Sequence, residues 1–300
     1  MHEDPDSFKP ERGLCLRLMS VSAQVYHSQY MSEANLAVEA TETSLVWIRL
    51  RREVQAMAET EPMLASYLHA AVLKHRTLED SLSYLLAGRL SSSYFSAMSF
   101  REIFDEAFAA SPGIREAICC DLLAVVDRDP AARGVAQPFL HYKGFHALQS
   151  YRVAHWLWLE GRQALASFYQ NRISEVFGID IHPAARVGKG ILIDHGTSVV
   201  IGETAVVGDN VSMLHEVTLG GTGKETGDRH PKVGHGVLIG AGAKVLGNVR
   251  IGDGAKIGAG SVVLNDVPPH TTVAGVPAKI VGHPETEEPA LSMDQNIESQ

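Results

Sequence analysis

The most regular stretch of the chain is residues 233–263, which read VGHGVLIGAGAKVLGNVRIGDGAKIGAGSVV. An aliphatic residue stands at every sixth position, and a glycine directly follows most of these residues. Each six-residue unit is long enough for one short strand and one corner, with the aliphatic side chain pointing inward and glycine turning the chain. The stretch therefore predicts an architecture built from stacked hexapeptide repeats.

The same six-residue spacing continues upstream of this stretch, in a second run of inward-pointing aliphatic or small residues. We call these residues anchors. Within each run the step is six residues; between the runs it is 16, which we interpret as one step plus ten inserted residues. Three flat sides make one triangular coil of about 18 residues, and each coil buries its anchors only against its neighbours. The sequence therefore predicts a β-helix over residues 179–282 with an inserted loop at 218–232. The thirteen anchors are Ile181, Val187, Ile193, Val199, Ala205, Val211 and Val217, then Val233, Ile239, Val245, Ile251, Ile257 and Val263.

The preceding part of the chain has a different composition and predicts helices. All 20 aromatic residues lie between Phe8 and Phe177, whereas 20 of the 27 glycines lie within residues 179–282. Trp47, Leu50 and Val54 have the spacing of an amphipathic helix, and Ser99 with Glu102 fits a capping box. Further helices are predicted near 62–75, 78–90, 99–110, 112–128 and 140–177.

We therefore predict an α+β multidomain protein. Residues 1–41 are a candidate disordered N-terminal extension, residues 42–178 an all-α domain, residues 179–282 the β-helix, and residues 283–300 an acidic tail.

The formal net charge of −9 disfavours a general nucleic-acid binder, since such proteins need a positive field. Cys15, Cys119 and Cys120 form neither a disulfide framework nor a metal-ligand spacing. With no apolar run long enough for a membrane span and no signal-peptide pattern, a cytoplasmic protein is expected.

Several longer motifs resemble a known family. The repeat stretch resembles the left-handed parallel β-helix of hexapeptide acyltransferases, and the motifs together resemble serine O-acetyltransferase over about four fifths of the chain. In the repeats these are Asp180-Ile-His-Pro-Ala-Ala-Arg-Val-Gly188, Ile193-Asp-His-Gly-Thr197, Thr218-Leu-Gly-Gly-Thr-Gly-Lys224, Gly227-Asp-Arg-His-Pro-Lys232 and Ala274-Gly-Val-Pro-Ala-Lys279. In the helical half they are Glu61-Pro-Met-Leu-Ala-Ser66, Arg128-Asp-Pro-Ala131 and Lys143-Gly-Phe-His-Ala-Leu-Gln149.

This resemblance implies acetyl transfer from acetyl-CoA to the hydroxyl of L-serine, the first step of cysteine biosynthesis from serine. Attack on the thioester needs a base, and the family pattern places that base on His195 and its orienting acid on Asp180. Their separation along the chain is slightly shorter than one coil, so side chains of adjacent coils can meet. An acyl-cysteine route is rejected because no cysteine lies in the repeats, which leaves direct transfer in a ternary complex.

The resemblance also implies residues for both substrates. Serine is a zwitterion, so its site needs an anion for the ammonium group and a cation for the carboxylate. The family pattern assigns the ammonium to Asp129 and Asp194, and the carboxylate to Arg229 and His230. For coenzyme A, the pattern places the pantetheine arm and a phosphate contact on Gly221, Ala241, Ala259 and Lys279. Ala241 and Ala259 are separated by the length of one coil, so they are expected to stack on one edge.

The partners implied are L-cysteine as a feedback inhibitor and further copies of the chain, as a trimer or a dimer of trimers. Family members dock a C-terminal isoleucine into O-acetylserine sulfhydrylase, and this chain departs from that pattern by ending Ile297-Glu-Ser-Gln300.

Two alternatives remain open: an acetyltransferase for a sugar or an antibiotic, and a γ-class carbonic anhydrase that binds zinc. The second would use histidines among His195, His215, His230 and His235; our interpretation expects no metal, no nucleic acid and no membrane.

Overall fold

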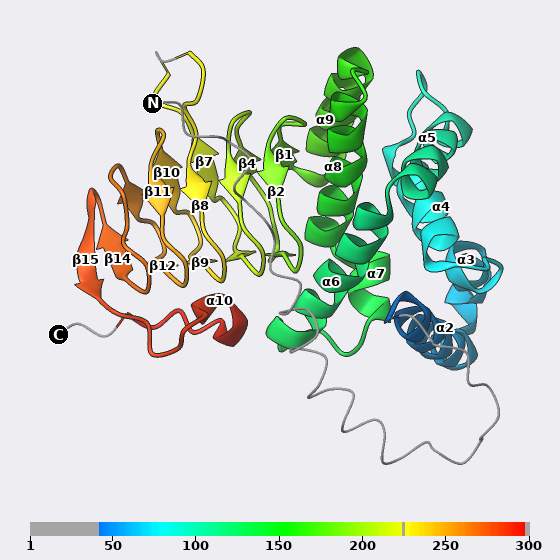
Figure 1. Cartoon of the computed structure of the whole chain (residues 1–300). Coiled ribbons are helices and arrows are strands. Elements are labelled where there is room, and N and C mark those ends of the chain that lie inside the picture. Colours follow the sequence, from blue (N-terminus) through cyan, green and yellow to red (C-terminus); the bar gives the residue numbers. More distant parts are fainter. Residues whose placement is uncertain (1–41, 224–225, 298–300) are drawn as a thin grey trace. The chain divides into compact units, whose positions relative to one another are not determined.

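The computed structural model describes residues 42–223 and 226–297, which belong to one compact unit (Figure 1). The predicted disordered extension at residues 1–41 lies outside the described residues. A helical part comes first and a parallel β-helix follows it, so the predicted architecture is confirmed. Among the described residues, no helix is both long and apolar enough to cross a membrane.

The helical part begins with an amphipathic helix that buries Val46, Leu50 and Val54. Ser96 caps α5 (Ala97–Ala110) by accepting a hydrogen bond from the backbone N–H of Ser99 at 3.1 Å, so the capping box predicted at Ser99 is wrong. The predicted helix 140–177 is interrupted at Tyr142, which has an extended backbone, and again at Gly161, whose φ of 75° turns the chain. The elements are α2 (Glu42–Thr60), η1 (Pro62–Leu64), α3 (Ala65–Leu68), η2 (His69–Leu73), α4 (Leu78–Leu90), α5 (Ala97–Ala110), α6 (Pro112–Arg128), α7 (Ala136–His141), α8 (Lys143–Leu159) and α9 (Gln163–Phe177).

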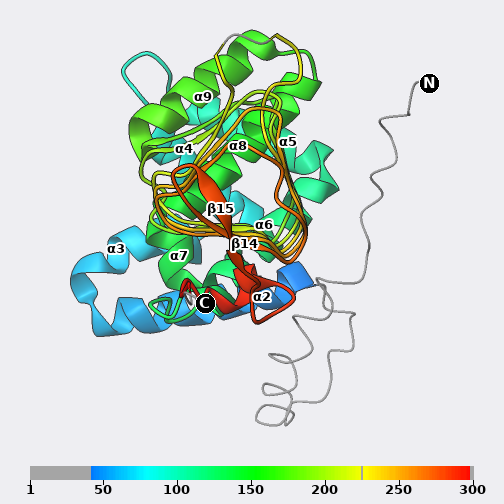
Figure 2. The same ribbon diagram turned by 90° about the vertical axis from the view of Figure 1, so that its left-hand side faces the viewer.

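The β-helix consists of short strands that form three parallel sheets, one on each side of the stacked coils (Figure 2). The first sheet contains β1 (Ile179–Ile181), β4 (Val199–Ile201), β7 (Thr218–Gly220), β10 (Lys244–Leu246) and β13 (Val262–Val263). The second contains β2 (Arg186–Val187), β5 (Val206–Val207), β8 (Lys232–Val233) and β11 (Arg250–Ile251). The third contains β3 (Leu192–Ile193), β6 (Ser212–Met213), β9 (Leu238–Ile239), β12 (Lys256–Ile257), β14 (Thr272–Gly275) and the antiparallel β15 (Ala278–Gly282).

The strand register corrects the predicted phase of the repeat. Ile181 pairs with Ile201 and not with Val199, so the first coil contains a two-residue insertion. Leu219 and Val233 occupy successive anchor positions, so the inserted loop between them adds eight residues and not ten. The structure therefore replaces four predicted anchors, Val199, Ala205, Val211 and Val217, by Ile201, Val207, Met213 and Leu219.

The helices end directly on the first coil. Gly178, with a φ of 67°, caps α9 in the left-handed conformation, and β1 starts at the next residue. The start of α8 lies against the end of β3, where a Cβ on Gly144 would stand 2.0 Å from the carbonyl oxygen of Ile193. Only glycine permits so close an approach, and the residues after Ile193 are thereby fixed to the helical part.

The described part of the tail folds back over the third sheet. Helix α10 (Pro289–Ser292) is held by Ala290, whose N–H donates to Gly236 and whose carbonyl accepts from Ser212. Beyond it, the buried Lys256 ammonium donates to Asp294 and to the carbonyl of Asn296.

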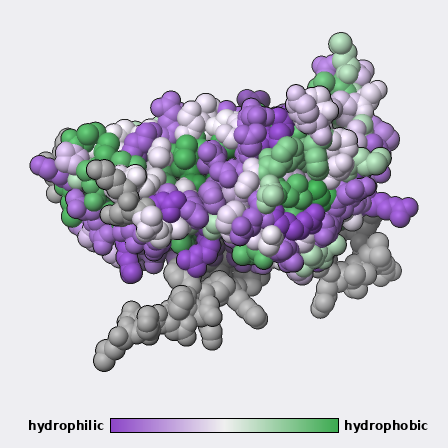
Figure 3. Space-filling view, turned by 90° about the horizontal axis from the view of Figure 1, so that it is seen from above, coloured by the Kyte–Doolittle hydropathy of each residue, from purple (hydrophilic) through white to green (hydrophobic). Residues whose placement is uncertain are grey.

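Large apolar side chains are also exposed on the surface. Seen from above, hydrophobic residues lie over both the helices and the coils (Figure 3).

Candidate active site

One edge of the β-helix carries the predicted base and the two alanines of the coenzyme site. This edge is the corner that follows the third-sheet strands. The anchors Ile193, Met213, Ile239 and Ile257 stack in register there. Ala241 and Ala259 each come two residues after one of these anchors and form one column on this corner, here called the base edge. His195 follows Ile193 at the same corner, where the first coil carries its two-residue insertion and the N–H of Glu216 donates to the carbonyl of Thr197. The predicted stacking of Ala241 on Ala259 is confirmed by this register, and the N–H of Gly260 donates to the carbonyl of Ala241.

His195 combines an unusual backbone conformation with a solvent-exposed side chain. Its φ is 55°, in the left-handed region that non-glycine residues seldom adopt, and its side chain is 74% exposed. The nearest carboxylate is Asp194, whose Oδ1 lies 3.9 Å from Nε2 of His195. An exposed imidazole held on a turn between two coils is free to meet a substrate from outside the coil.

Asp180 points outward from β1 and is held from the helical part. Its neighbours Ile179 and Ile181 are buried, and Gln170 of α9 donates a hydrogen bond from Nε2 to Oδ1 of Asp180 at 2.7 Å. Asp180 and His195 lie in the same coil, not in adjacent coils as their spacing suggested. Within the described part of the chain no hydrogen bond or ion pair joins them, so the role of Asp180 stays a prediction.

The two carboxylates predicted for the ammonium group lie near a common side chain. Asp129 ends α6 and accepts a hydrogen bond from the N–H of Ala131, while Asp194 follows β3. Tyr142, just before α8, is hydrogen-bonded to Asp129. Burial raises the pKa of the Tyr142 hydroxyl, and Asp129 and then Asp194 raise it further. The structure therefore brings these two acids together around Tyr142, which the sequence did not single out.

Arg229 and His230 lie on a different edge, at the corner between the first and second sheets. Arg229 forms an ion pair with Glu203, 2.6 Å between Nη2 and Oε2, which lowers the pKa of that glutamate. Burial and the nearby Arg229 and Lys232 lower the pKa of His230, and its Nδ1 lies 2.9 Å from Oγ1 of Thr204. Gly202 is required here, because its Cβ would stand 2.0 Å from the His230 ring.

The remaining coenzyme candidates are spread along the β-helix. Gly221 follows β7 on the Arg229 side, where a Cβ would stand 3.4 Å from the Arg229 carbonyl. Lys279 is exposed on β15 and pairs with Ala274 of β14. Successive coils pack closely at the base edge, where a Cβ on Gly240 would stand 2.6 Å from the backbone nitrogen of Ala259. The side chains of Ala241 and Ala259 are methyl groups, which are small and apolar enough to lie beside the apolar part of a pantetheine arm.

The histidines considered for zinc do not form one cluster in the chain. His195 lies on the base edge, His230 on the Arg229 edge, and His235 after β8 at the third corner. Among residues 42–223 and 226–297, no group of three His, Cys, Asp or Glu side chains is placed to hold a metal ion. The one chain therefore presents two separate sets of polar groups, on the base edge and on the Arg229 edge.

The chain is similar to known proteins over most of its length. The family profile "Serine acetyltransferase, N-terminal" matches residues 46–150, and "Bacterial transferase hexapeptide (six repeats)" matches residues 230–265. A serine acetyltransferase of Salmonella typhimurium is 56% identical over 256 residues, which are 85% of this chain and 94% of the relative. A crystal structure of serine acetyltransferase from Vibrio cholerae has a TM-score of 0.84 and 59% identity, over 85% of this chain and 98% of that one.

A solved complex of serine acetyltransferase with cysteine is similar as well. Its TM-score is 0.82 at 54% identity, over 84% of this chain and 98% of that chain. A match over 84% of this chain is longer than either the helical part or the β-helix alone. The chain belongs to the serine acetyltransferase family.

Proposed function

We propose that the chain transfers the acetyl group of acetyl-CoA to the hydroxyl of L-serine, which gives O-acetyl-L-serine and coenzyme A. The observation that carries this proposal is the base edge, where an exposed imidazole lies at the same corner of the β-helix as a column of two alanines that leave room for a coenzyme arm. The reaction supplies O-acetyl-L-serine for cysteine synthesis. Cys119 and Cys120 are buried in α6, which favours direct transfer in a ternary complex.

His195 takes the proton from the serine hydroxyl as the oxygen attacks the thioester carbon. Asp180 orients and stabilises the imidazole once the substrates are bound. Asp129 and Asp194 bind the serine ammonium, and their proximity to Tyr142 supports a shared anionic pocket. The carboxylate is bound by a separate pair, Arg229 and His230.

We place the complete site between copies of the chain. His195 and Arg229 lie on different edges of one β-helix, so a neighbouring copy that brings its Arg229 edge to this base edge would complete the site. A trimer of parallel β-helices would contain three such contacts and therefore three complete sites. Exposed apolar side chains on the first helices, among them Leu45, Ile48 and Met63, are candidate contacts between two trimers. We place the enzyme in the cytoplasm.

Acetyl-CoA is a co-substrate in this proposal, bound along Gly221, Ala241 and Ala259 with Lys279 at a phosphate. L-cysteine is proposed to compete with serine, because it differs only by sulfur in place of oxygen. The similar structure solved with cysteine supports this part of the proposal.

The decisive experiment is release of free thiol from acetyl-CoA with and without L-serine, for wild type and His195→Ala. We expect serine-dependent release by the wild type and a loss of roughly 10²–10⁴-fold in the variant. Equal rates with a galactoside or chloramphenicol would reassign the acceptor. Stoichiometric zinc that is lost together with activity would favour the carbonic anhydrase alternative. Full turnover by His195→Ala would remove the proposed base.

A mixing experiment tests the shared site. His195→Ala and Arg229→Ala chains are each expected to be inactive as pure oligomers. When the two are refolded or expressed together, some sites combine His195 of one copy with Arg229 of another, and part of the activity returns. Mixed oligomers that remain inactive would show that each site is built from a single chain.

A further inference from the structure

The three elements that carry the proposed ammonium pocket contact one another. Helices α6 and α8 pack together beside the β-helix (Figure 1), and both contact β3 of the first coil. Asp129 ends α6, Tyr142 precedes α8, and Asp194 follows β3. These residues are far apart in the sequence, and the packing of two helices on the coil brings them together.

Two contacts fix the start of α8 against the turn that follows β3. Gly144 approaches Ile193 so closely that a Cβ would stand 2.0 Å from its carbonyl oxygen. Lys143 donates a hydrogen bond from Nζ to Oγ1 of Thr197 at 2.5 Å. Tyr142 directly precedes these two residues of α8, so its position beside that turn is fixed as well.

The hydroxyl of the half-buried Tyr142 interacts with both carboxylates of the pocket. Its hydrogen bond goes to Asp129, and the phenol donates because a carboxylate can only accept. Burial raises the pKa of the Tyr142 hydroxyl, and Asp129 and then Asp194 raise it further, so the phenol keeps its proton. Oδ1 of Asp129 also accepts from the N–H of Ala131 at 2.8 Å, so this carboxylate is held by two donors.

A neutral donor suits a pocket that is made of two carboxylates. Two such groups repel each other, and without a donor the Asp129 side chain is free to rotate away from Asp194. A hydroxyl that donates to one of them opposes this rotation and stabilises its charge. Because the hydroxyl adds no positive charge of its own, both carboxylates stay available to the ammonium group of the substrate.

We infer that Tyr142 is a positioning residue for the amino-acid substrate, which holds the Asp129 carboxylate in the orientation that binds the substrate ammonium group. This inference rests on the proposed function, because it takes Asp129 and Asp194 as the ammonium ligands. The hydroxyl acts through Asp129 and touches neither the acetyl group nor the coenzyme. L-serine and L-cysteine carry the same ammonium group, so the binding of both depends on Tyr142, whereas the turnover of bound serine does not.

The test is Tyr142→Phe, which removes the hydroxyl and keeps the ring. Tyr84→Phe is the matched control, because it removes a hydroxyl from α4, where the ring contacts Lys74 and His75. Measurements are kcat, the KM for L-serine and for acetyl-CoA, the inhibition constant of L-cysteine, and the unfolding midpoint. We expect Tyr142→Phe to raise the KM for L-serine and the inhibition constant of L-cysteine together, each about tenfold, with kcat and the KM for acetyl-CoA within about twofold.

The unfolding midpoint of Tyr142→Phe is expected to stay close to that of the wild type, and Tyr84→Phe to leave every quantity within about twofold. A double-mutant cycle then shows whether the hydroxyl acts through Asp129. In an Asp129→Ala background the carboxylate is already absent, so adding Tyr142→Phe should raise the KM for L-serine by less than about twofold.

A KM for L-serine of Tyr142→Phe within about twofold of wild type would overturn the inference. So would the full tenfold effect in the Asp129→Ala background, or a loss of kcat and of unfolding midpoint that accompanies the rise in KM. A wild type that does not turn over L-serine overturns the proposed function instead, which separates the two failures.

Discussion

Arg152 of α8 donates two hydrogen bonds to one carboxylate oxygen of Asp121 of α6, from Nε at 2.9 Å and from Nη2 at 2.7 Å. Both side chains are buried, with exposures of 8% and 0%. Gln149 donates a third hydrogen bond to the same oxygen at 2.9 Å. An ion pair so far from water is stable only if its remaining polar atoms also find partners.

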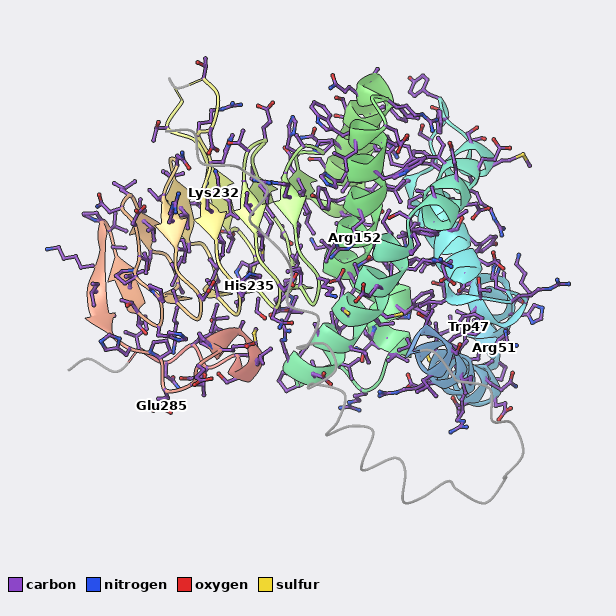
Figure 4. The ribbon with its side chains drawn as sticks, in the orientation of Figure 1. Trp47, Arg51, Arg152, Lys232, His235 and Glu285 are labelled. Carbon is purple, nitrogen blue, oxygen red and sulfur yellow. The ribbon has the colours of Figure 1, made fainter. Side chains whose placement is uncertain are left out.

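Those partners belong to the β-helix. The other oxygen of Asp121 accepts from the N–H of Ile191 at 3.0 Å, and Nη2 of Arg152 also donates to the carbonyl of Gly188 at 2.7 Å. Arg152 lies between the helices and the first coil (Figure 4). The pair therefore joins two helices to the coil that carries Asp180 and His195.

Replacing Asp121 by asparagine is expected to destabilise the protein by about 3–5 kcal/mol, because the Arg152 guanidinium is left buried without its counter-charge. The measurement is the free energy of unfolding in denaturant, at a fixed protein concentration since the chain is proposed to be oligomeric.

Glu106→Gln is the matched control for that variant. Glu106 forms an ion pair with Arg162 at 2.9 Å, but both side chains are largely exposed. Its loss is expected to change stability by less than about 1 kcal/mol. A similar small effect for Asp121→Asn would show that the buried pair does not join the helices to the coil as described.

The periodicity of the sequence predicted the β-helix but not its register. On each side of a coil two inward positions are aliphatic, such as Val199 and Ile201, or Val211 and Met213, and both are buried. After a two-residue insertion, the aliphatic residue found at every sixth position is no longer the same inward residue of the coil but the other one. The sequence therefore keeps its six-residue spacing of aliphatic residues although the strands have shifted by two residues. The pairing of strands, which depends on hydrogen bonds between coils, reveals the shift.

The candidate site was predicted where its residues belong to motifs, and missed where contacts join distant segments. The column of Ala241 and Ala259 follows from a spacing of one coil. The bonds of Gln170 to Asp180, of Tyr142 to Asp129, and of Glu203 to Arg229 join different elements. Glutamine, tyrosine and glutamate at these positions give no local signal, because their partners are set by the packing of helices on the coil.

His146 is expected to make the protein sensitive to acid. It is buried in α8 and donates a hydrogen bond from Nε2 to the carbonyl of Phe139 at 2.7 Å, and burial lowers its pKa to about 3. The unfolded chain takes up the proton below about pH 6.5, whereas the folded chain does so only near pH 3. Stability is therefore lost as the pH falls through this window, by up to about 1.4 kcal/mol for each pH unit.

The measurement is the free energy of unfolding at several pH values between 7.5 and 4.5, for wild type and His146→Gln. The variant is expected to be less stable at pH 7.5, because it loses the fitted ring, but to fall less steeply with acid. Parallel curves for the two proteins would contradict the assignment of the acid sensitivity to His146.

Lys256 is expected to hold the C-terminal segment against the third sheet. Its ammonium donates to the carbonyl of Asn296 at 2.5 Å and to Asp294 at 3.2 Å. Lys256→Met removes both bonds, so amide hydrogen exchange in residues 289–297 should become faster by about tenfold or more, with the strands of the coils unchanged. Lys279→Met, at an exposed position, is the control; equal exchange in both variants would remove this role from Lys256.

Gly144 is expected to tolerate no side chain, although it lies in a helix where alanine is normally favoured. An alanine Cβ would stand 2.0 Å from the carbonyl oxygen of Ile193, a backbone atom that cannot rotate away. Gly144→Ala should therefore separate α8 from β3, lower the free energy of unfolding by about 1–3 kcal/mol, and reduce kcat/KM for serine, because Asp194 and His195 follow Ile193 directly. Gly88 of α4 is the matched control: no atom lies within 4 Å of its Cβ position, so Gly88→Ala should stabilise the protein by about 0.5–1 kcal/mol. If both alanine variants gained stability and kept full activity, the close contact between α8 and β3 would not be what positions the base.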